Sequence, residues 1–452
     1  MLQYQKYKAV ESLWNLNFPN HWDVFPLCSM AKEKSICNCT DLELLSVYLD
    51  AGVVPFSKRT EKRTNTTSKD LSKYQRVDVG DFVLNNQQAW RGSVGVSKYT
   101  GITSPAYIIL SLNDQLTINY ANYLFRSRIM VDQYLVASKG VGSIQRNLYW
   151  QDLKRASVLV PPKDEQEQIV RYLDWKVSHI NRLIHGYQRQ IKLLEERRLT
   201  LVDNVVTKGL NPNAEMNDSG VYWLGEIPNN WDVIRAKYLF KKEKREPLEN
   251  DEVVTCFRDG EVTLRKNRRT TGFTESLQEN GYQHVCKGDL VIHVMDAFAG
   301  AIGISDSDGK GTPVYHCCTP LRNDVYVPYY MHFLRMMAHV GYIQSLYRGI
   351  RERSTNFTFD IFSAQMLAMP SFEEQQEIVA YIEQQTAQIN LLKGKIAKQI
   401  SFLEEYRTRL ISDVVTGQID VRDIEIPNYT FEEDNSLSTE TDYIEEVSDD
   451  AE

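Results

Sequence analysis

The residue patterns that usually carry catalysis are missing from this chain of 452 residues. No Asn/Asp-Pro-Pro-Tyr/Phe motif for methyl transfer occurs, and the pair Pro161-Pro162 is followed by Lys163. The glycine-rich segment 303–311 has the wrong spacing for a phosphate-binding loop, and Gly311 stands where that loop needs Ser or Thr. HExxH and GxSxG motifs are also absent. We therefore expect no catalytic residue in this chain.

Metal-binding patterns are equally sparse. The seven cysteines include no CxxC pair, and the eight histidines do not recur at ligand spacing. His284 and His293 are interpreted as ordinary strand residues, and free cysteine thiols are the favoured state. Cys37 and Cys39 with a distant histidine remain an alternative metal site. We expect no bound metal.

Charge is distributed unevenly along the chain. The formal net charge is −8, while hydrophobic residues make up 42% and charged residues 25%, which are values typical of globular proteins. Residues 1–160 carry 19 Lys and Arg against 13 Asp and Glu, whereas residues 426–452 carry ten acids and no base. We expect this acidic tail to be disordered. The N-terminus lacks a signal-peptide pattern and no segment is apolar enough to span a membrane, so a soluble cytoplasmic protein is expected.

The sequence contains an internal repeat, so the elements that position any site occur in two copies. Residues 18–24 (FPNHWDV) recur as 227–233 (IPNNWDV) at an offset of 209, and Trp14 falls on Trp223. At an offset of 208, GDFV at 80–83 recurs as GDLV at 288–291. From residue 140 to residue 210 the offset of 209 returns without a gap, with Glu165 and Gln166 matching Glu374 and Gln375. An internal repeat of this length decides the architecture.

Each copy divides into a globular part and a long helix. Short apolar runs separated by Gly and Pro predict an α+β fold for the globular parts. After the prolines that open each helix, apolar residues recur at alternating spacings of three and four, which is the pattern of a coiled-coil seam. The seam residues are Leu173, Val177, Ile180, Ile184, Ile191, Leu194 and Leu201 in the first helix, and Ile382, Ile389, Ile396, Ile400, Leu403 and Leu410 in the second.

The repeat and the seam together predict two pseudo-symmetric globular domains separated by two long antiparallel helices that form a coiled coil. The alternative is two separate helices, each lying on its own domain. The expected segments are a first domain at 1–160, a first helix at 161–210, a second domain at 211–369 that opens with a linker at 211–217, a second helix at 370–417, and the acidic tail at 426–452.

Three motifs resemble the specificity subunits of type I restriction-modification systems. They are the segment 218–233 (DSGVYWLGEIPNNWDV), the pair of segments 80–85 and 89–92, and Pro161-Pro162 followed by Glu165, Gln166 and Ile169. The resemblance covers nearly the whole chain except the acidic tail. It implies that each globular part is a target recognition domain that reads one half of a bipartite, asymmetric DNA site, and that the helices set the spacing.

The resemblance also implies partners and cofactors. Two methyltransferase subunits would dock on the helices and methylate adenine with S-adenosylmethionine, and restriction-translocase subunits would use ATP and Mg. No cofactor is expected on this chain itself, and no membrane partner. Two other classes remain open: a DNA-binding adaptor or regulator outside restriction, and a structural coiled-coil protein without a DNA role.

The duplication separates scaffold from reading residues, because residues shared by two domains that read different sequences cannot encode the difference. Trp22 and Trp231, with the shared Gly and Ala positions, are therefore predicted to be structural. Readers are expected where the copies diverge, since Arg and Lys bind guanine or phosphate while Gln binds adenine; a merely solvated loop is the alternative. The candidates are Lys58, Arg59, Lys62, Arg63, Gln87, Arg91, Arg146, Arg265, Lys266, Arg268, Arg269, Arg348, Arg351 and Arg353.

Overall fold

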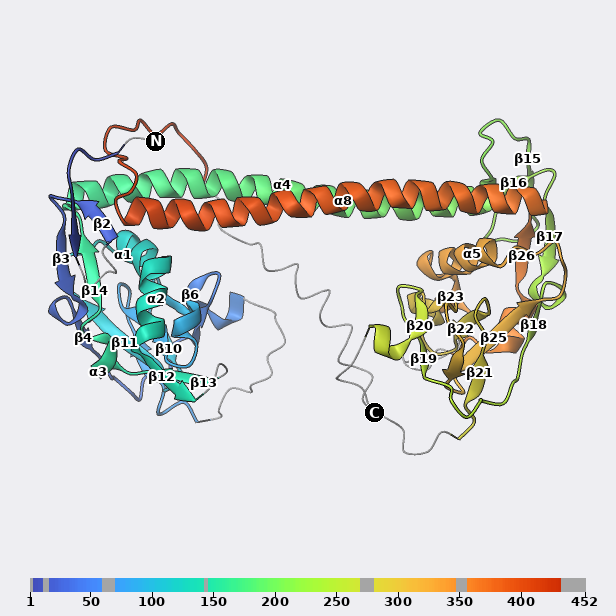
Figure 1. The fold of residues 1–452 in the computed structure, drawn as a ribbon, viewed down its shortest axis with the longest axis horizontal. Helices are drawn as coiled ribbons and strands as arrows, with labels where there is room; N and C mark the ends of the chain where they lie inside the picture. Colours follow the sequence, from blue (N-terminus) through green and yellow to red (C-terminus); the bar gives the residue numbers. More distant parts are fainter. Residues whose placement is uncertain are drawn as a thin grey trace. The chain divides into compact units, whose positions relative to one another are not determined.

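The computed structural model describes residues 3–10, 16–58, 70–141, 145–268, 280–346 and 356–431. They form two compact units that are not contiguous in sequence. Unit 1 takes the described residues up to Gln188 and those from Ala397 onward, and unit 2 takes the described residues from Arg189 to Ile396. Each unit therefore combines a globular part with one end of each long helix (Figure 1).

Unit 1 is built on a four-stranded antiparallel sheet in the order β4-β11-β8-β9. Antiparallel pairs β1–β2, β3–β14, β5–β6, β7–β10 and β12–β13 surround it. Its strands are β1 (Tyr7–Val10), β2 (Leu16–Pro19), β3 (Asp23–Pro26), β4 (Ala31–Glu33), β5 (Leu45–Tyr48), β6 (Gly52–Pro55), β7 (Gln75–Val77), β8 (Phe82–Asn85), β9 (Val94–Val96), β10 (Gly101–Thr103), β11 (Tyr107–Leu112), β12 (Ser138–Val141), β13 (Gln145–Leu148) and β14 (Ser157–Val160). Its short helices and 3-10 turns are α1 (Ile118–Phe125), α2 (Arg128–Ala137), α3 (Trp150–Leu153), η2 (Leu27–Ser29), η3 (Phe56–Lys58) and η4 (Ala89–Arg91).

Unit 2 repeats this framework, with a four-stranded sheet in the order β18-β25-β22-β23 and antiparallel pairs β15–β16, β17–β26, β19–β20 and β21–β24. Its strands are β15 (Met216–Asp218), β16 (Glu226–Pro228), β17 (Asp232–Arg235), β18 (Phe240–Lys242), β19 (Val254–Cys256), β20 (Val262–Leu264), β21 (Gln283–Val285), β22 (Leu290–His293), β23 (Ile302–Ile304), β24 (Gly309–Gly311), β25 (Tyr315–Pro320) and β26 (Met366–Met369). Its helices and turns are α5 (Val327–His339), α6 (Tyr342–Ser345), α7 (Phe359–Ala364), η5 (Ala236–Tyr238), η6 (Arg265–Asn267) and η7 (Ala297–Ala299). The pair β12–β13 has no counterpart among the described residues of unit 2.

The central strands are buried on both faces, which explains why they appear in the sequence as continuous apolar runs and not as alternating ones. In β8, Phe82 and Leu84 join the main core of unit 1 with α1 and α2, while Val83 joins a second cluster with Val47 and Val53 of the β5–β6 hairpin. Unit 2 does the same with β22 and the β19–β20 hairpin. In each unit the hairpin thus covers the sheet face that the helices leave open.

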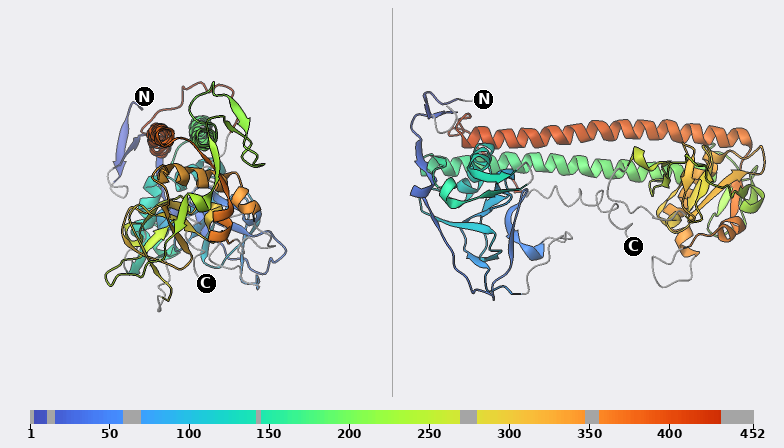
Figure 2. Two further views of the ribbon diagram at one scale, coloured as in Figure 1. Left: turned by 90° about the vertical axis from the view of Figure 1, so that its right-hand side faces the viewer. Right: turned by 60° about the horizontal axis from the view of Figure 1, so that its bottom comes forward.

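The two long helices are α4 (Lys163–Lys208) and α8 (Phe372–Val415). The start of α4 and the end of α8 share the core of unit 1, whereas the end of α4 and the start of α8 share the core of unit 2. The helices therefore run antiparallel and lie side by side within each unit (Figures 1 and 2). The predicted fold class is confirmed, and the alternative of one helix on each domain is wrong, because both helices contribute to both units.

Every predicted seam residue is buried or half-buried, and none is exposed. Two charged residues, Lys393 and Arg407, interrupt the seam of α8, and each has a polar partner on α4. Arg407 donates to the Asn181 side chain at 2.7 Å in unit 1, and Lys393 pairs with Glu195 at 2.6 Å in unit 2. Burial raises the pKa of Glu195, but hydrogen bonds from Arg198 and Lys393 outweigh it and the pKa is lowered. The Lys393–Glu195 pair balances one charge in the seam, and the neutral Asn181 side chain gives the Arg407 guanidinium a hydrogen-bond acceptor.

Two segment boundaries differ from those expected from the sequence. The expected linker at 211–217 includes the first residues of β15, which pairs with β16 in the register Asn217 opposite Ile227. At the other end, residues 426–431 of the expected tail are described and lie beside α4, while residues 432–452 lie outside the described residues. Within the described part of the chain, no helix combines the length and the apolar character needed to cross a membrane.

Candidate nucleic-acid interface

A shared anchor joins each globular part to its long helices. The buried Trp22 indole donates to Glu165 of α4 at 3.1 Å, and the Trp231 indole donates to Glu374 of α8 at 2.9 Å. The same tryptophans contact the glycine that ends the other helix: Gly417 lies against Trp22, and Gly209 lies against Trp231. Both glycines have φ of +73°, the left-handed conformation that ends a helix and that other residues rarely adopt. The predicted structural role of the two tryptophans is confirmed.

The glutamine after each anchor glutamate holds the entry to the helix. Gln166 accepts a hydrogen bond from the Thr117 backbone N–H at 2.8 Å and donates to the backbone carbonyls of Gln115 and Pro161 at 2.9 and 3.0 Å. Gln375 makes the same three bonds in unit 2, to the backbone of Tyr326, Asp324 and Pro370. Both glutamines are fully buried. The repeated Glu-Gln pair is thus scaffold, and it cannot distinguish one DNA sequence from another.

In unit 1 the candidate readers follow two short turns. Lys58 ends η3, directly after the β5–β6 hairpin, and its exposed ammonium lies 3.2 Å from the Tyr99 hydroxyl. Arg91 ends η4, with its guanidinium 4.6 Å from the centre of the Trp90 ring, and Gln87 precedes the turn on the exposed surface. Arg146 is half-buried on β13. The candidates Arg59, Lys62 and Arg63 lie outside the described residues.

In unit 2 the equivalent turn is η6, which follows the β19–β20 hairpin as η3 follows β5–β6. Arg265 donates to Thr255 at 3.3 Å, and Lys266 pairs with Glu252 at 2.5 Å. Arg268 pairs with Asp259 at 2.7 Å and lies over the Phe257 ring. The sequence did not reveal that these cations already have acidic or hydroxyl partners. The candidates Arg269, Arg348, Arg351 and Arg353 lie outside the described residues.

The pairing of these cations does not prevent them from binding an anion. Each ion pair involves partly exposed side chains, and such pairs contribute only about 0–1 kcal/mol. A phosphate or a guanine edge offers a comparable or better acceptor, so exchange of partners has a small free-energy cost. The structure therefore places two basic turns, η3 and η6, at the same position of the repeated fold, where the two copies differ in sequence.

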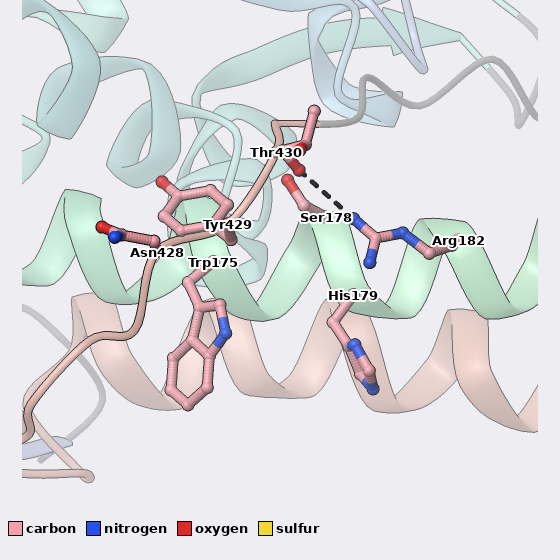
Figure 3. Close-up of a pocket in the computed structure, with 7 residues that line it drawn as sticks. All are labelled: Trp175, Ser178, His179, Arg182, Asn428, Tyr429 and Thr430. Atoms are coloured by element: carbon pink, nitrogen blue, oxygen red, sulfur yellow. Dashed lines mark hydrogen bonds between the residues drawn. The ribbon is translucent and has the colours of Figure 1, made fainter.

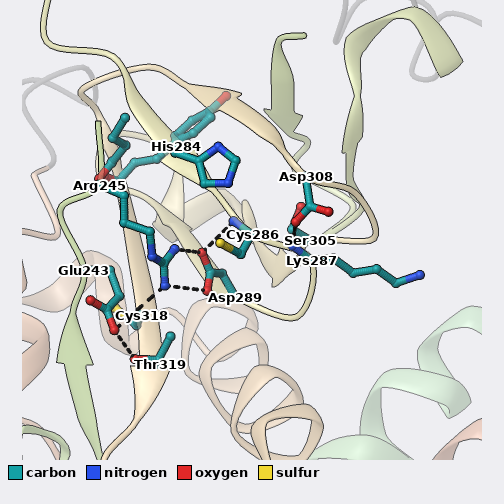
Figure 4. Close-up of polar contacts among 12 residues, drawn as sticks. Glu243, Arg245, His284, Cys286, Lys287, Asp289, Ser305, Asp308, Cys318 and Thr319 are labelled. Carbon is teal, nitrogen blue, oxygen red and sulfur yellow. Dashed lines mark hydrogen bonds and ion pairs between the residues drawn. The ribbon is translucent and has the colours of Figure 1, made fainter. Parts of the chain in front are cut away.

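The sequence did not predict two further features, a surface groove and a cluster of side chains. The first is a shallow groove in unit 1 where residues 428–430 lie beside Trp175 and His179 of α4, and Arg182 donates to the Thr430 carbonyl at 3.4 Å (Figure 3). The second is a cluster of His284, Cys286 and Asp308 at the edge of unit 2 (Figure 4). His284 lies on β21, Cys286 directly follows that strand and Asp308 directly precedes β24, so the three residues form neither a CxxC motif nor a pair of histidines.

Comparison with known proteins agrees with this architecture. Residues 19–193 match the family model of the type I restriction modification DNA specificity domain. The match covers part of the chain, and it lies in unit 1 and the first part of α4. This match and the curated relatives agree with the predicted resemblance to type I specificity subunits.

Curated relatives come from the archaeon Methanocaldococcus jannaschii. The type I restriction enzyme MjaVIII specificity subunit is 24% identical over 246 residues, which are 52% of this chain and 53% of the relative. The putative type I restriction enzyme MjaX specificity subunit is 26% identical over 178 residues, covering 37% of this chain and 38% of the relative. The aligned part thus spans about half the length, or less, of these relatives.

A solved structure shows the same fold over most of the chain. It belongs to a study of complex assembly and conformational transition of the type I R-M system, and it covers 89% of this chain and 99% of its own chain with a TM-score of 0.60. Sequence identity is only 15%, so this likeness establishes the fold alone.

Proposed function

We propose that the chain reads a bipartite DNA target, with unit 1 recognising one half-site and unit 2 the other. The observation that carries this proposal is the internal duplication. The two units share their framework down to the Trp–Glu anchor and the buried glutamine, yet they differ in the basic turns η3 and η6. Identical scaffolds with different polar turns are what two independent readers of different sequences require.

The same proposal assigns the long helices to spacing and to partner docking. Along them, Leu183, Leu193, Leu391 and Phe402 expose between 43% and 67% of their surface, although other leucines of the same helices are buried in the seam. These exposed apolar side chains are available for contact with another protein. We assign this contact to two methyltransferase subunits, in line with the resemblance to type I specificity subunits.

Cofactors belong to the partners in this proposal. S-adenosylmethionine binds the methyltransferase subunits, ATP and Mg bind the restriction-translocase subunits, and this chain contributes base recognition. The protein's contribution to the reaction is then to hold the target adenine within reach of a partner that extrudes and methylates it.

The first prediction concerns activity. The purified full-length chain with labelled S-adenosylmethionine and DNA is expected to transfer no methyl group and to cut no strand. Adding the methyltransferase subunit of the same system is expected to give adenine methylation at a single bipartite sequence, read by methylome sequencing. Methyl transfer by the chain alone would refute the proposal, and sequence-independent methylation by the pair would refute its role as reader.

The second prediction separates the two readers. Replacing Arg265, Arg268 and Arg269 with Ala is expected to weaken recognition of one half-site only, because all three follow the β19–β20 hairpin of unit 2. The matched control is Lys58→Ala with Arg91→Ala, which should affect the other half-site. Binding to DNA with either half scrambled is measured over a range of salt concentrations. The salt slope should fall by roughly one for every phosphate that a substitution leaves unbound. Equal weakening at both halves would contradict two independent readers.

A further inference from the structure

The edge of unit 2 carries a set of side chains with the chemistry of a metal site. One ligand atom each from His284, Cys286 and Asp308 lies within 4.8 Å of the other two. His284 lies on β21, Cys286 directly follows that strand, and Asp308 directly precedes the paired strand β24. Figure 4 shows the imidazole, the thiol and the carboxylate around the same end of this strand pair. In a tetrahedral zinc site, metal–ligand distances of about 2.0–2.3 Å place the ligand atoms roughly 3.5 Å apart. Small side-chain rotations would bring the three atoms, now within 4.8 Å of one another, to this separation.

The surrounding contacts orient two of the three ligands. The Nδ1 atom of His284 lies 2.7 Å from the carboxylate of Asp251, which is almost fully buried. A carboxylate on one ring nitrogen leaves the other nitrogen to a metal and makes it a stronger ligand. The Asp308 carboxylate accepts a hydrogen bond from the Lys287 backbone N–H at 2.9 Å through Oδ1. This bond leaves the second carboxylate oxygen, Oδ2, for a metal ion. A histidine backed by a buried carboxylate is the arrangement found around bound metal ions.

The first copy of the repeat provides an internal comparison. Strands β7–β10 and β21–β24 pair in the same register, so Arg76 and Asp78 occupy the positions of His284 and Cys286. There the two side chains bind each other: Arg76 pairs with Asp78 at 2.8 Å, and Lys34 pairs with Asp78 at 2.6 Å. In unit 1 the side chains of this edge are therefore joined by ion pairs within the chain. Unit 2 replaces that closed arrangement with a nitrogen, a sulfur and an oxygen ligand.

Arg245 of unit 2 does not take the role that Arg76 and Lys34 have in unit 1. Arg245 is held by Asp289, with a bond of 2.5 Å, and lies within 3.8 Å of Glu243. Its charge is therefore already balanced by two carboxylates on the other side of Cys286 (Figure 4). The remaining donors are an imidazole, a thiol and a carboxylate, which together suit a borderline-soft divalent ion.

We propose that His284, Cys286 and Asp308 bind one Zn²⁺ ion, with Asp251 orienting the histidine and water as the fourth ligand. Binding replaces the thiol proton of Cys286, which passes to solvent. The ion ties the end of β21 to the loop before β24, and so stiffens the edge of unit 2 at the place where unit 1 uses an ion-pair network. Zinc binding should raise the melting temperature of the chain, because a ligand that binds only the folded state stabilises it.

Cobalt(II) titration of the untagged full-length chain tests this site, since Co²⁺ replaces Zn²⁺ and reports a thiolate ligand by a near-ultraviolet charge-transfer band. One equivalent of Co²⁺ is expected to bind, with the absorption of a four-coordinate ion, and Zn²⁺ is expected to displace it. Cys286→Ser should abolish the charge-transfer band. Asp251→Asn should weaken binding about 10- to 100-fold, as removal of a supporting carboxylate does at other metal sites.

The matched control is Cys37→Ser, which removes an exposed thiol from unit 1 and should leave the titration unchanged. Melting curves without metal establish that each variant is folded, and His284→Ala provides a second ligand variant if Cys286→Ser is unstable. The proposal is overturned if the folded wild-type chain binds no stoichiometric Co²⁺ or Zn²⁺. It is equally overturned if Cys286→Ser and His284→Ala bind the ion as the wild type does. Neither outcome bears on DNA reading, which the methylation assay tests separately.

Discussion

A chain truncated after residue 212, expressed with the methyltransferase subunit, is expected to abandon the asymmetric target and to methylate a palindrome. The palindrome should consist of two copies of the half-site read by unit 1, with a similar spacing. This expected result depends on the proposed function. Its structural reason is that the core of each unit contains residues from one end of α4 and from one end of α8.

The core of unit 1 is incomplete without the end of α8. Leu410, Val414 and Val415 are buried in that core, and the Tyr120 hydroxyl donates to the Val415 carbonyl at 3.4 Å. Unit 2 receives the end of α4 in the same way, since Val205 and Val206 are buried there and the Tyr329 hydroxyl donates to the Val206 carbonyl at 2.8 Å. A truncated chain therefore exposes the end of its own α4 and lacks a partner for its core.

A second copy of the truncated chain satisfies both needs. Val205 and Val206 are the repeat counterparts of Val414 and Val415, so the end of α4 from one copy fits the position that α8 occupies in the other. The internal pseudo-symmetry then becomes a true two-fold axis, and the two readers become identical and inverted.

Light scattering and methylome sequencing check this prediction. The truncated chain should be a dimer, and all methylation should move from the asymmetric site to the palindrome. Val205→Asp with Val206→Asp in the truncated chain is the control, because buried charges at this position should prevent dimerisation. A monomeric truncated chain, or methylation that stays at the asymmetric site, would show that the ends of α4 and α8 are not interchangeable.

Replacing Gln166 with Leu is expected to destabilise unit 1 by about 3 kcal/mol. The change leaves the Thr117 N–H and the carbonyls of Gln115 and Pro161 without their partner, and an unsatisfied buried polar group costs about 1–3 kcal/mol. Partial access of water to the first two groups reduces the total. Urea unfolding followed by circular dichroism measures the destabilisation, which should appear in one of two transitions because the chain has two units.

Gln190→Leu serves as the control, since Gln190 is an exposed residue of α4 and its replacement should change stability by no more than about 0.5 kcal/mol. Gln375→Leu should produce a similar destabilisation in the other transition, because Gln375 makes equivalent bonds in unit 2. A destabilisation below about 1 kcal/mol for both buried glutamines would contradict their role as scaffold at the helix entry.

Much of this protein was determined by the sequence alone, because the signals concerned are local or repeated. Heptad spacing depends on residues three and four apart, so the long helices and their seam were predictable. The duplication distinguished scaffold from divergent residues without any structure, and the burial of Trp22 and Trp231 agrees with that division. The family resemblance rested on the same repeated motifs, and comparison with known proteins confirmed it.

Tertiary structure alone decided which distant residues meet. Sequence spacing does not specify contacts between residues some two hundred positions apart, so it did not show that each unit is completed by the far end of the other copy's helix. Ion pairs such as Arg268 with Asp259 depend on how a hairpin folds back, and periodicity carries no information about that. The cluster of His284, Cys286 and Asp308 arises because strand pairing brings a loop carboxylate beside a strand edge. Such side chains become neighbours only through β-sheet register, which is set by the packing of the whole unit.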